Sequence, residues 1–166
     1  MTFLLLLACT PQIPGDSSDG PALSAFAQGF VDAHNDARGR AQPTPSPALP
    51  DLSWDDDLAA IADDWAAQCV WEHSMGPTGE NLAAFSYEVE PKDVVDAWFS
   101  EIDFFDYASN TCDAGEQCGH YTQVVWRSTE RVGCAKRSCD LQGFGPAEYW
   151  VCEYDPAGNW VGEKPY

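Results

Sequence analysis

The chain has 166 residues, of which 45% are hydrophobic and 13% aromatic, which is enough for one substantial core but not for two comparable domains. Its 27 Asp and Glu residues outnumber 8 Lys and Arg residues, so the formal net charge is -19. This charge repels a phosphate backbone and argues against nucleic acid as a partner, whereas it draws cations toward any cleft where carboxylates converge.

The first nine residues resemble a bacterial export signal with a lipobox. An apolar run directly precedes Cys9, and the sequence LLAC fits the pattern in which the cysteine is lipidated and becomes the mature first residue. The run is short and lacks Lys and Arg, so two alternatives stay open: a true start further upstream, and a hydrophobic tail without function. No stretch approaches the roughly 18 apolar residues of a spanning helix, so a lipid anchor is the one membrane attachment expected.

Residues 10–22 read TPQIPGDSSDGPA, a composition that cannot bury apolar surface and that predicts a flexible tether. The folded domain is expected to span residues 23–166. Signal, tether and domain together account for the whole chain, and no internal repeat is present.

Apolar residues at helical spacing predict three helices in the first part of this domain. The first lies in LSAFAQGFVDAHNDAR, and the Pro-rich stretch AQPTPSPALP after it is a loop. Ser53 is the predicted cap of the second, and Pro91 suits the first turn of the third. The predicted inward-facing residues are Phe26, Phe30, Ala33, His34 and Ala37, then Leu58, Ile61, Ala62, Trp65 and Cys69, and finally Val94, Val95, Trp98, Phe99 and Ile102.

Beyond residue 120 the period changes from helical to alternating. The stretches TQVVWRS, RVGCAKRSC and EYWVCEYD carry β-branched and aromatic residues between Gly, Pro and Asp, and are predicted to be strands. Helices followed by strands, without β-α-β alternation, predict an α+β layer protein.

Four stretches in this order resemble the CAP superfamily, the cysteine-rich secretory, antigen 5 and pathogenesis-related class 1 proteins. They are HNDAR (34–38), GENLA (79–83), CGHYTQVVW (118–126) and YWVCEYDPAGNWVGEKPY (149–166). The similarity is greatest to the plant pathogenesis-related class 1 type. It implies a three-layer α-β-α sandwich with a central antiparallel sheet, an extracellular location, and a shallow cleft with two histidines and two acidic residues.

By motif, the four cleft residues are His73, Glu80, Glu101 and His120, with His120 at the edge of a strand. Two neutral imidazoles beside carboxylates suit Zn²⁺ or another divalent cation, which makes His73 and His120 the candidate metal ligands. The alternative is that the four side chains only hydrogen-bond one another. His34 lies on the inward side of the first helix and is interpreted as a hydrogen-bonded core histidine.

Seven cysteines are many for a cytosolic protein of this size. With Cys9 assigned to the lipobox, six remain for the domain. A zinc site made of some of them fits the spacing, but an exported protein oxidises such thiols. The pairing that the resemblance implies is Cys69 with Cys139, Cys112 with Cys118, and Cys134 with Cys152.

The resemblance favours a non-enzymatic binding module with a defence or toxin-like role, anchored by lipid on the outer face of a cell envelope or secreted. Its cleft would take a divalent metal, a sterol-like lipid or a glycan. The alternative is a hydrolase in which Glu80 or Glu101 activates metal-bound water, or Ser74 or Ser100 is the nucleophile. No GxSxG elbow or HExxH helix supports that alternative. Residues 156–166 also resemble a peptide released from plant relatives, although a turn closing the last strand explains them better.

Overall fold

The computed structural model describes residues 22–166, so the predicted signal and lipobox, Cys9 included, lie outside the described residues, as does nearly all of the tether. The elements in chain order are α1 (Ala25–Arg40), β1 (Ser53–Trp54), α2 (Asp56–Ala66), β2 (Gly79–Phe85), α3 (Pro91–Phe99), the 3₁₀ helix η1 (Ser100–Phe104), β3 (Phe105–Asp106), β4 (Thr111–Cys112), α4 (Gly119–Val124), β5 (Arg131–Leu141) and β6 (Gly145–Asp155).

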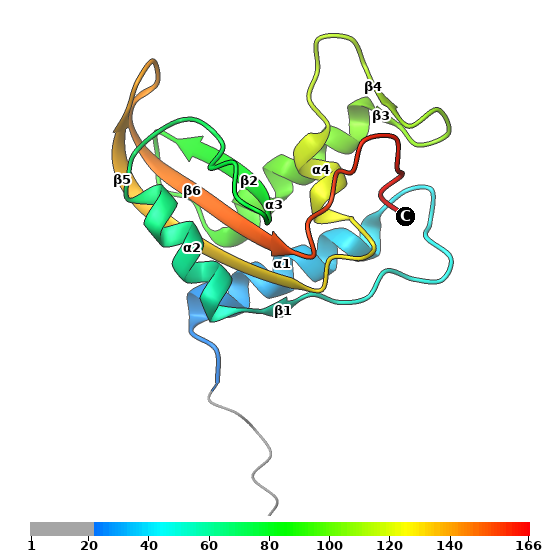
Figure 1. Ribbon diagram of the computed structural model, residues 1–166, viewed down its shortest axis with the longest axis horizontal. Coiled ribbons are helices and arrows are strands. Elements are labelled where there is room, and N and C mark those ends of the chain that lie inside the picture. The colour runs from blue at the N-terminus through cyan, green and yellow to red at the C-terminus, as the bar shows by residue number, and fades with distance from the viewer. Residues whose placement is uncertain (1–21) are drawn as a thin grey trace, which may run out of the picture.

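The molecule is the expected α+β sandwich, with helices on both faces of a central sheet (Figure 1). The sheet order is β1-β5-β6-β2, and β5 and β6 form a long antiparallel hairpin. Strand β2 is antiparallel to β6 at one edge, while the short β1 is parallel to β5 at the other. The sheet is therefore mixed, and antiparallel over its three long strands. Strands β3 and β4 form a separate small hairpin.

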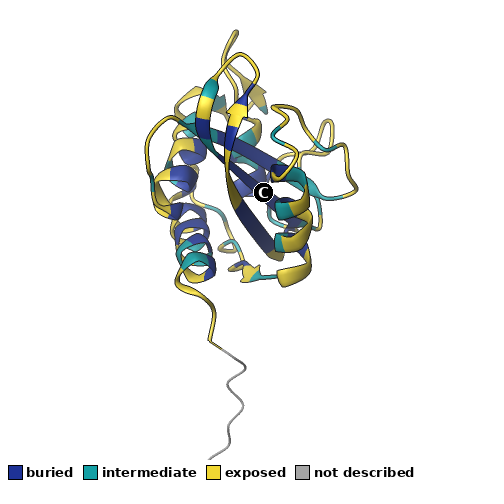
Figure 2. Cartoon of the chain, turned by 90° about the vertical axis from the view of Figure 1, so that its left-hand side faces the viewer, coloured by how far each residue is buried: buried dark blue, intermediate teal, exposed yellow. Residues whose placement is uncertain are grey.

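Two hydrophobic clusters lie on opposite faces of the sheet. The larger one packs α1, α3 and α4 against side chains such as Cys134, Trp150 and Tyr154. The smaller one packs α2 against side chains such as Tyr149 and Val151. Figure 2 shows the buried residues running along the long strands and the inner sides of the helices. Because side chains alternate along each strand, both faces of β6 are buried, one in each cluster.

The helix ends follow local sequence signals, with one correction. Ser24 caps α1, and Pro91 begins α3 in a capping box formed by Glu90. Helix α2 is capped by Asp55, whose carboxylate accepts from two backbone N–H groups, so the prediction of Ser53 as the cap was wrong. Ser53 instead belongs to β1, which the sequence pattern did not reveal because a two-residue strand has no period.

The predicted strand TQVVWRS is wrong, because most of it lies in and just beyond the helix α4. His120 is thus at the start of a short helix and not at a strand edge. The apolar residues Tyr121, Val124 and Val125 are all buried against α1 and α3, so tertiary packing overrides their β propensity.

The strand β2 was also missed, since GENLA was interpreted only as a motif. Ile61 is a smaller correction: it is 44% exposed rather than inward-facing.

The structure contains three disulfides, one of which ties a helix to the sheet. Cys69, just after α2, is bonded to Cys139 on β5, and Cys112 on β4 is bonded to Cys118 in front of α4. The third joins the facing strands β5 and β6 through Cys134 and Cys152, which are direct partners in the ladder. The pairing is the one that the family resemblance implied.

The last residues are docked against the domain. Arg127 N donates to the Pro165 carbonyl at 2.7 Å, and the Tyr107 hydroxyl donates to the Tyr166 carbonyl. The rings of Tyr107 and Tyr166 stack with centroids 4.7 Å apart.

Between residues 22 and 166, no helix combines the length and the apolar character needed to cross a bilayer.

Candidate functional site

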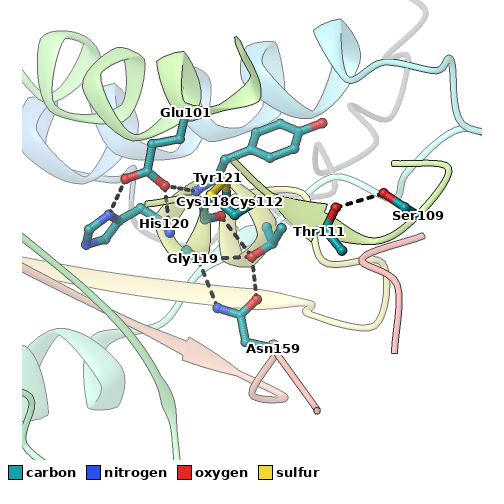
Figure 3. Close-up of a disulfide and its surroundings, with 10 residues drawn as sticks. Glu101, Ser109, Thr111, Cys112, Cys118, Gly119, His120, Tyr121 and Asn159 are labelled. Carbon is teal, nitrogen blue, oxygen red and sulfur yellow. Dashed lines mark hydrogen bonds and ion pairs between the residues drawn. A yellow bond between two sulfur atoms is a disulfide. The ribbon is translucent and has the colours of Figure 1, made fainter. Parts of the chain in front are cut away.

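The first half of the site is His120 with Glu101 (Figure 3). Glu101 lies in η1, and its Oε1 is 2.6 Å from His120 Nδ1. Its Oε2 accepts from the backbone N–H groups of His120 and Tyr121, each at 3.0 Å. These N–H groups are at the start of α4 and have no partner inside the helix, so Glu101 both orients the imidazole and caps the helix. The ring of Trp98 stacks with the imidazole, with ring centroids 6.2 Å apart.

The second half is His73 with Glu80. His73 lies in the loop between α2 and β2, and Glu80 is the second residue of β2. Glu80 Oε1 is 2.6 Å from His73 Nδ1 and accepts from the Ser74 N–H at 3.1 Å. The carboxylate is almost fully buried, with 6% of the Glu80 side chain exposed against 56% for His73. A buried carboxylate thus holds an exposed imidazole in place.

The two halves meet at one cleft of about 430 Å³. Both imidazoles line it with Glu80, while Glu101 lies behind His120. Each Nδ1 is fixed by a carboxylate, and neither Nε2 has a hydrogen-bond partner among the described residues. A carboxylate at Nδ1 favours the tautomer with its proton there and leaves the Nε2 lone pair free, as in metal-binding histidines. The residues that line the cleft are His73, Glu80, Asn81, Gln117, Cys118, Gly119, His120 and Asn159.

Two asparagines of this cleft were missed by the sequence analysis. Asn159 donates to the Gly119 carbonyl at 2.8 Å and accepts from the Thr122 hydroxyl at 2.7 Å, so it fastens the C-terminal segment to α4 (Figure 3). Asn81 donates to the His120 carbonyl at 3.1 Å. Asn159 has a positive φ of 58°, a conformation that Asn tolerates well, and the sequence signal for it was the Gly158-Asn159 pair after the last strand. Among residues 22–166, no lysine or arginine lines the cleft.

The candidate nucleophiles do not reach the histidines. The Ser74 hydroxyl accepts from the Gly76 N–H at 3.3 Å, and the Ser100 hydroxyl donates to the Ala97 carbonyl at 2.7 Å. Among the described residues, neither hydroxyl hydrogen-bonds an imidazole.

His34 is outside the cleft and fully buried, as the sequence indicated. Its Nδ1 lies 2.8 Å from the Phe30 carbonyl, and its Nε2 lies 2.9 Å from the Tyr154 hydroxyl. Because the carbonyl only accepts, Nδ1 carries the proton and Nε2 accepts from Tyr154. Burial lowers the pKa of His34 to about 4, with the bond to Phe30 opposing this effect.

The donor set suits a divalent cation only in part. Within residues 22–166, no group of three or more His, Cys, Asp or Glu side chains is placed to hold a metal ion together. His73 and His120 can supply two nitrogens, and water or a bound ligand would have to complete the coordination. Zn²⁺ and similar ions accept imidazole nitrogen, and the second-shell carboxylates that orient such ligands are present.

Known proteins give an independent view of the chain. The model of CAP, the cysteine-rich secretory protein family, matches residues 31–154. Pathogenesis-related protein 1A of Nicotiana tabacum is 44% identical over 144 residues, which are 84% of this chain and 80% of that protein. Peptidase inhibitor 16 of Mus musculus is 43% identical over 145 residues, but these make up only 29% of that longer protein.

Solved structures agree on the fold. The venom allergen-like protein 4 of Schistosoma mansoni superimposes with a TM-score of 0.69 at 24% identity, over 87% of this chain and 95% of that one. The structure of NaASP2 with Zn²⁺ superimposes with a TM-score of 0.67 at 26% identity, over 89% and 88% of the two chains. With the family match, the tobacco relative and the three-layer fold in agreement, the chain belongs to the CAP family of cysteine-rich secretory proteins.

Proposed function

We propose that this protein is an exported binding module whose cleft holds one divalent cation between His73 and His120 without turning over a substrate. The observation that supports this most is that a carboxylate fixes each Nδ1 and leaves each Nε2 free beside the same cleft. The cation supplies a Lewis-acid site for an oxygen-bearing ligand. That a related structure, NaASP2, was solved with Zn²⁺ fits this role.

The carboxylates themselves favour binding over catalysis. A general base needs a carboxylate oxygen free to take a proton from water. In Glu101, Oε1 contacts the imidazole of His120 and Oε2 accepts from two backbone N–H groups. In Glu80, both oxygens accept from the Ser74 N–H, and Oε1 also contacts His73. Both acids are engaged in orienting histidines, so a hydrolase is the weaker of the two candidates.

The lining of the cleft favours a polar ligand. It is made of amide, imidazole and carboxylate groups with a disulfide at one side, and the described part of the chain contributes no Lys or Arg to it. Apart from the proposed cation, no described residue of this lining offsets the negative charge of Glu80 and of the chain as a whole, which disfavours an anionic headgroup or a sulfated glycan. A neutral glycan fits this chemistry better than a sterol, which needs an apolar pocket.

Calorimetric titration with Zn²⁺ tests the metal site. The parent should bind one Zn²⁺ per chain, and His73→Ala and His120→Ala should each weaken binding by at least tenfold. Affinity should also fall on acidification, because imidazole must be neutral to coordinate a metal. Asp140→Asn, an exposed acid that does not line the cleft, is the matched control and should bind as the parent does. Parent-like binding by either histidine variant would refute the shared site.

Assays of ester and peptide hydrolysis separate the two candidate functions. The binding module should show no turnover. Turnover that Glu80→Gln abolishes, in a protein that still binds Zn²⁺, would establish the hydrolase in its place.

We further propose that the protein is lipid-anchored at a bacterial envelope through Cys9, followed by residues 10–22 as a tether. The support is the lipobox pattern LLAC together with three disulfides, which are typical of proteins outside the reducing cytosol. Expressed in a bacterium with its own leader, the parent should fractionate with membranes and Cys9→Ser should not. Membrane association of Cys9→Ser would rule out the lipid anchor.

A further inference from the structure

A third carboxyl group lies behind the His73 side of the cleft and belongs to Glu153 on β6. Glu153 is completely buried and is the direct ladder partner of Glu80 on β2. Its Oε2 accepts from the Thr78 hydroxyl at 2.5 Å. Its Oε1 is buried and has no N–H or O–H donor among the described residues.

The contact between the two acids requires a proton. Glu80 and Glu153 are direct partners in the β2–β6 ladder, so their side chains lie side by side on one face of the sheet, close enough to share a hydrogen bond. Two ionised carboxylates can only accept, so such a bond exists only if one of the acids is protonated. Glu80 already accepts from His73 and from the Ser74 N–H, which favours its charged form. Glu153 is completely buried and accepts from a single hydroxyl donor, so the proton belongs to Glu153.

The surroundings of Glu153 agree with a neutral acid. Burial raises its pKa to about 8; the bond from Thr78 opposes this rise, and the charge and hydrogen bond of Glu80 add to it. From β6 itself the neutral hydroxyls of Tyr149 and Tyr154 are the other titratable groups acting nearby. On the β5 side its ladder partner is Gly133, which carries no side chain. No cationic side chain of the described residues contributes to this pKa.

We propose that Glu153 is a positioning residue of the cleft: its carboxyl group donates a hydrogen bond to Glu80 and holds that carboxylate against His73. The relay runs from Glu153 through Glu80 to the Nδ1 of His73, and it fixes the tautomer that presents Nε2 to the cleft. This proposal deepens the proposed function and rests on it in one respect, that His73 is a metal ligand. The geometry itself exists without metal.

Two substitutions separate the hydrogen bond from mere packing. Glu153→Gln has nearly the same shape and keeps a donor for Glu80, whereas Glu153→Leu keeps the bulk and removes the donor. Glu148→Gln, on the same strand but beyond the site, is the matched control. The readout is the tautomer of His73 in the metal-free protein, measured from the ¹⁵N shifts of its ring just above neutral pH, where an ordinary imidazole is uncharged.

The parent, Glu153→Gln and Glu148→Gln should all hold His73 mainly as the Nδ1–H tautomer, while Glu153→Leu should shift it toward Nε2–H, the form favoured by free imidazole side chains. His120 should not change in any variant. An unchanged His73 tautomer in a folded Glu153→Leu protein, or loss of the Nδ1–H form in Glu153→Gln, would overturn the proposal.

Stability against pH gives an answer even if Glu153→Leu does not fold. Between the ordinary glutamate pKa and about 8, the native parent keeps a proton that the unfolded chain has released, so its stability falls as pH rises through this window. Glu153→Gln cannot lose a proton and should lack this fall. Because every other group is shared, the difference between the two profiles isolates Glu153. Parallel profiles would show that Glu153 carries no proton.

Zinc titration keeps the two proposals distinct. If the parent binds Zn²⁺, Glu153→Leu should weaken binding by about tenfold, the lower end of the effect of removing a group that orients a histidine ligand. Glu153→Gln keeps the donor and should weaken binding by less than about twofold. If the parent binds no Zn²⁺, the proposed function fails, and the tautomer and stability measurements still decide the role of Glu153.

Discussion

At the scale of single residues, Arg38 shows how a motif residue can serve the core rather than the cleft. It ends the HNDAR stretch and is buried between α1 and the loop that follows α4. Its guanidinium donates to the carbonyls of Pro50, Val124 and Trp126 at 2.8, 3.0 and 2.9 Å. Burial lowers its pKa to about 10, so it stays charged at neutral pH. Arg38 thus satisfies the backbone oxygens of Pro50 and Val124 and gives a second hydrogen bond to that of Trp126, which also accepts from the Thr129 N–H at 3.2 Å.

Arg38→Met should therefore destabilise the protein strongly. It removes three hydrogen bonds and leaves the Val124 carbonyl without a donor in the interior, and we expect a loss of about 4 kcal/mol in the free energy of unfolding, measured with denaturant. Arg40→Met is the control two residues away, because Arg40 is exposed and only forms surface ion pairs with Asp36 and Asp96. That change should cost less than about 1 kcal/mol. Equal losses in the two variants would contradict the role of Arg38.

His34 predicts an acid-sensitive core. Its folded pKa, about 4, lies below the ordinary value, so the unfolded chain binds a proton that the native state refuses. The neutral His34 ring therefore adds about 3 kcal/mol to the free energy of unfolding. This stabilisation is complete above the pKa of an unfolded histidine, and it is lost as the pH falls toward the pKa of the folded state. A charged ring would also deprive the Tyr154 hydroxyl of its acceptor.

The measurement compares unfolding free energies of the parent and His34→Gln from neutral pH down to about pH 4, the lower end of this window. The variant should start less stable and lose less on acidification. If the free energy of unfolding falls with pH at the same rate in the parent and in the variant, His34 does not have the lowered pKa that its burial requires.

At the scale of elements, the sequence predicted α1, α2, α3, β5 and β6 because each has enough residues for its period to show. Helix α4 was mistaken for a strand because it has only 6 residues, several of them β-branched or aromatic. What makes it a helix is distant: the Glu101 carboxylate, 19 residues before His120, binds its first N–H groups. The motif singled out four residues that the structure brings together as two His–Glu pairs, but the use of Glu101 as a helix cap needed the structure.

The disulfides make a prediction at this scale. The bond from Cys69 to Cys139 closes a separation of 70 residues and ties α2 to β5, whereas that from Cys112 to Cys118 closes only 6. From the entropy of loop closure in the unfolded chain, the long bond is expected to stabilise the fold by about 4 kcal/mol and the short bond by about 2 kcal/mol. Replacing both cysteines of the long pair by Ser should thus cost about twice as much stability as replacing the short pair. The reverse order in denaturant unfolding would show that native contacts, and not chain closure, dominate.

At the scale of the whole molecule, the net charge of -19 is the dominant feature. Like charges repel across a compact surface more than in an extended chain, so the folded state carries the larger penalty. Salt screens this repulsion beyond about 8 Å at physiological ionic strength. We expect the midpoint of thermal unfolding to rise when NaCl is raised from low to physiological concentration.

The control is a second pH. Near the sequence pI of about 4.1 the net charge vanishes, and the same addition of salt should leave the midpoint almost unchanged. A fall in the midpoint with salt at neutral pH would mean that attractive ion pairs, such as those of Arg131 with Asp55 and Asp155, outweigh the net repulsion.

The layered fold could be predicted from the order of helices and strands. The sequence did not show that one strand, β2, supplies residues to both halves of the site. Strand β2 has no clear alternation in its sequence, because its residues face two different buried clusters. Leu82 belongs to the cluster under α2 and Ala83 to the cluster under α1 and α3. The same alternation sends Glu80 toward His73 and Asn81 toward His120. Adjacent residues of one edge strand thus serve opposite halves of the cleft.

This arrangement of β2 sets which genetic changes the protein can tolerate. A shift of the strand by one residue against β6 would exchange the two faces, so that an amide would replace the carboxylate behind His73. Deletion or insertion of a single residue between His73 and Glu80 is therefore far more harmful than most substitutions there. Loop length in this stretch is a stricter requirement than loop composition, and length variation among functional variants should be confined to other loops.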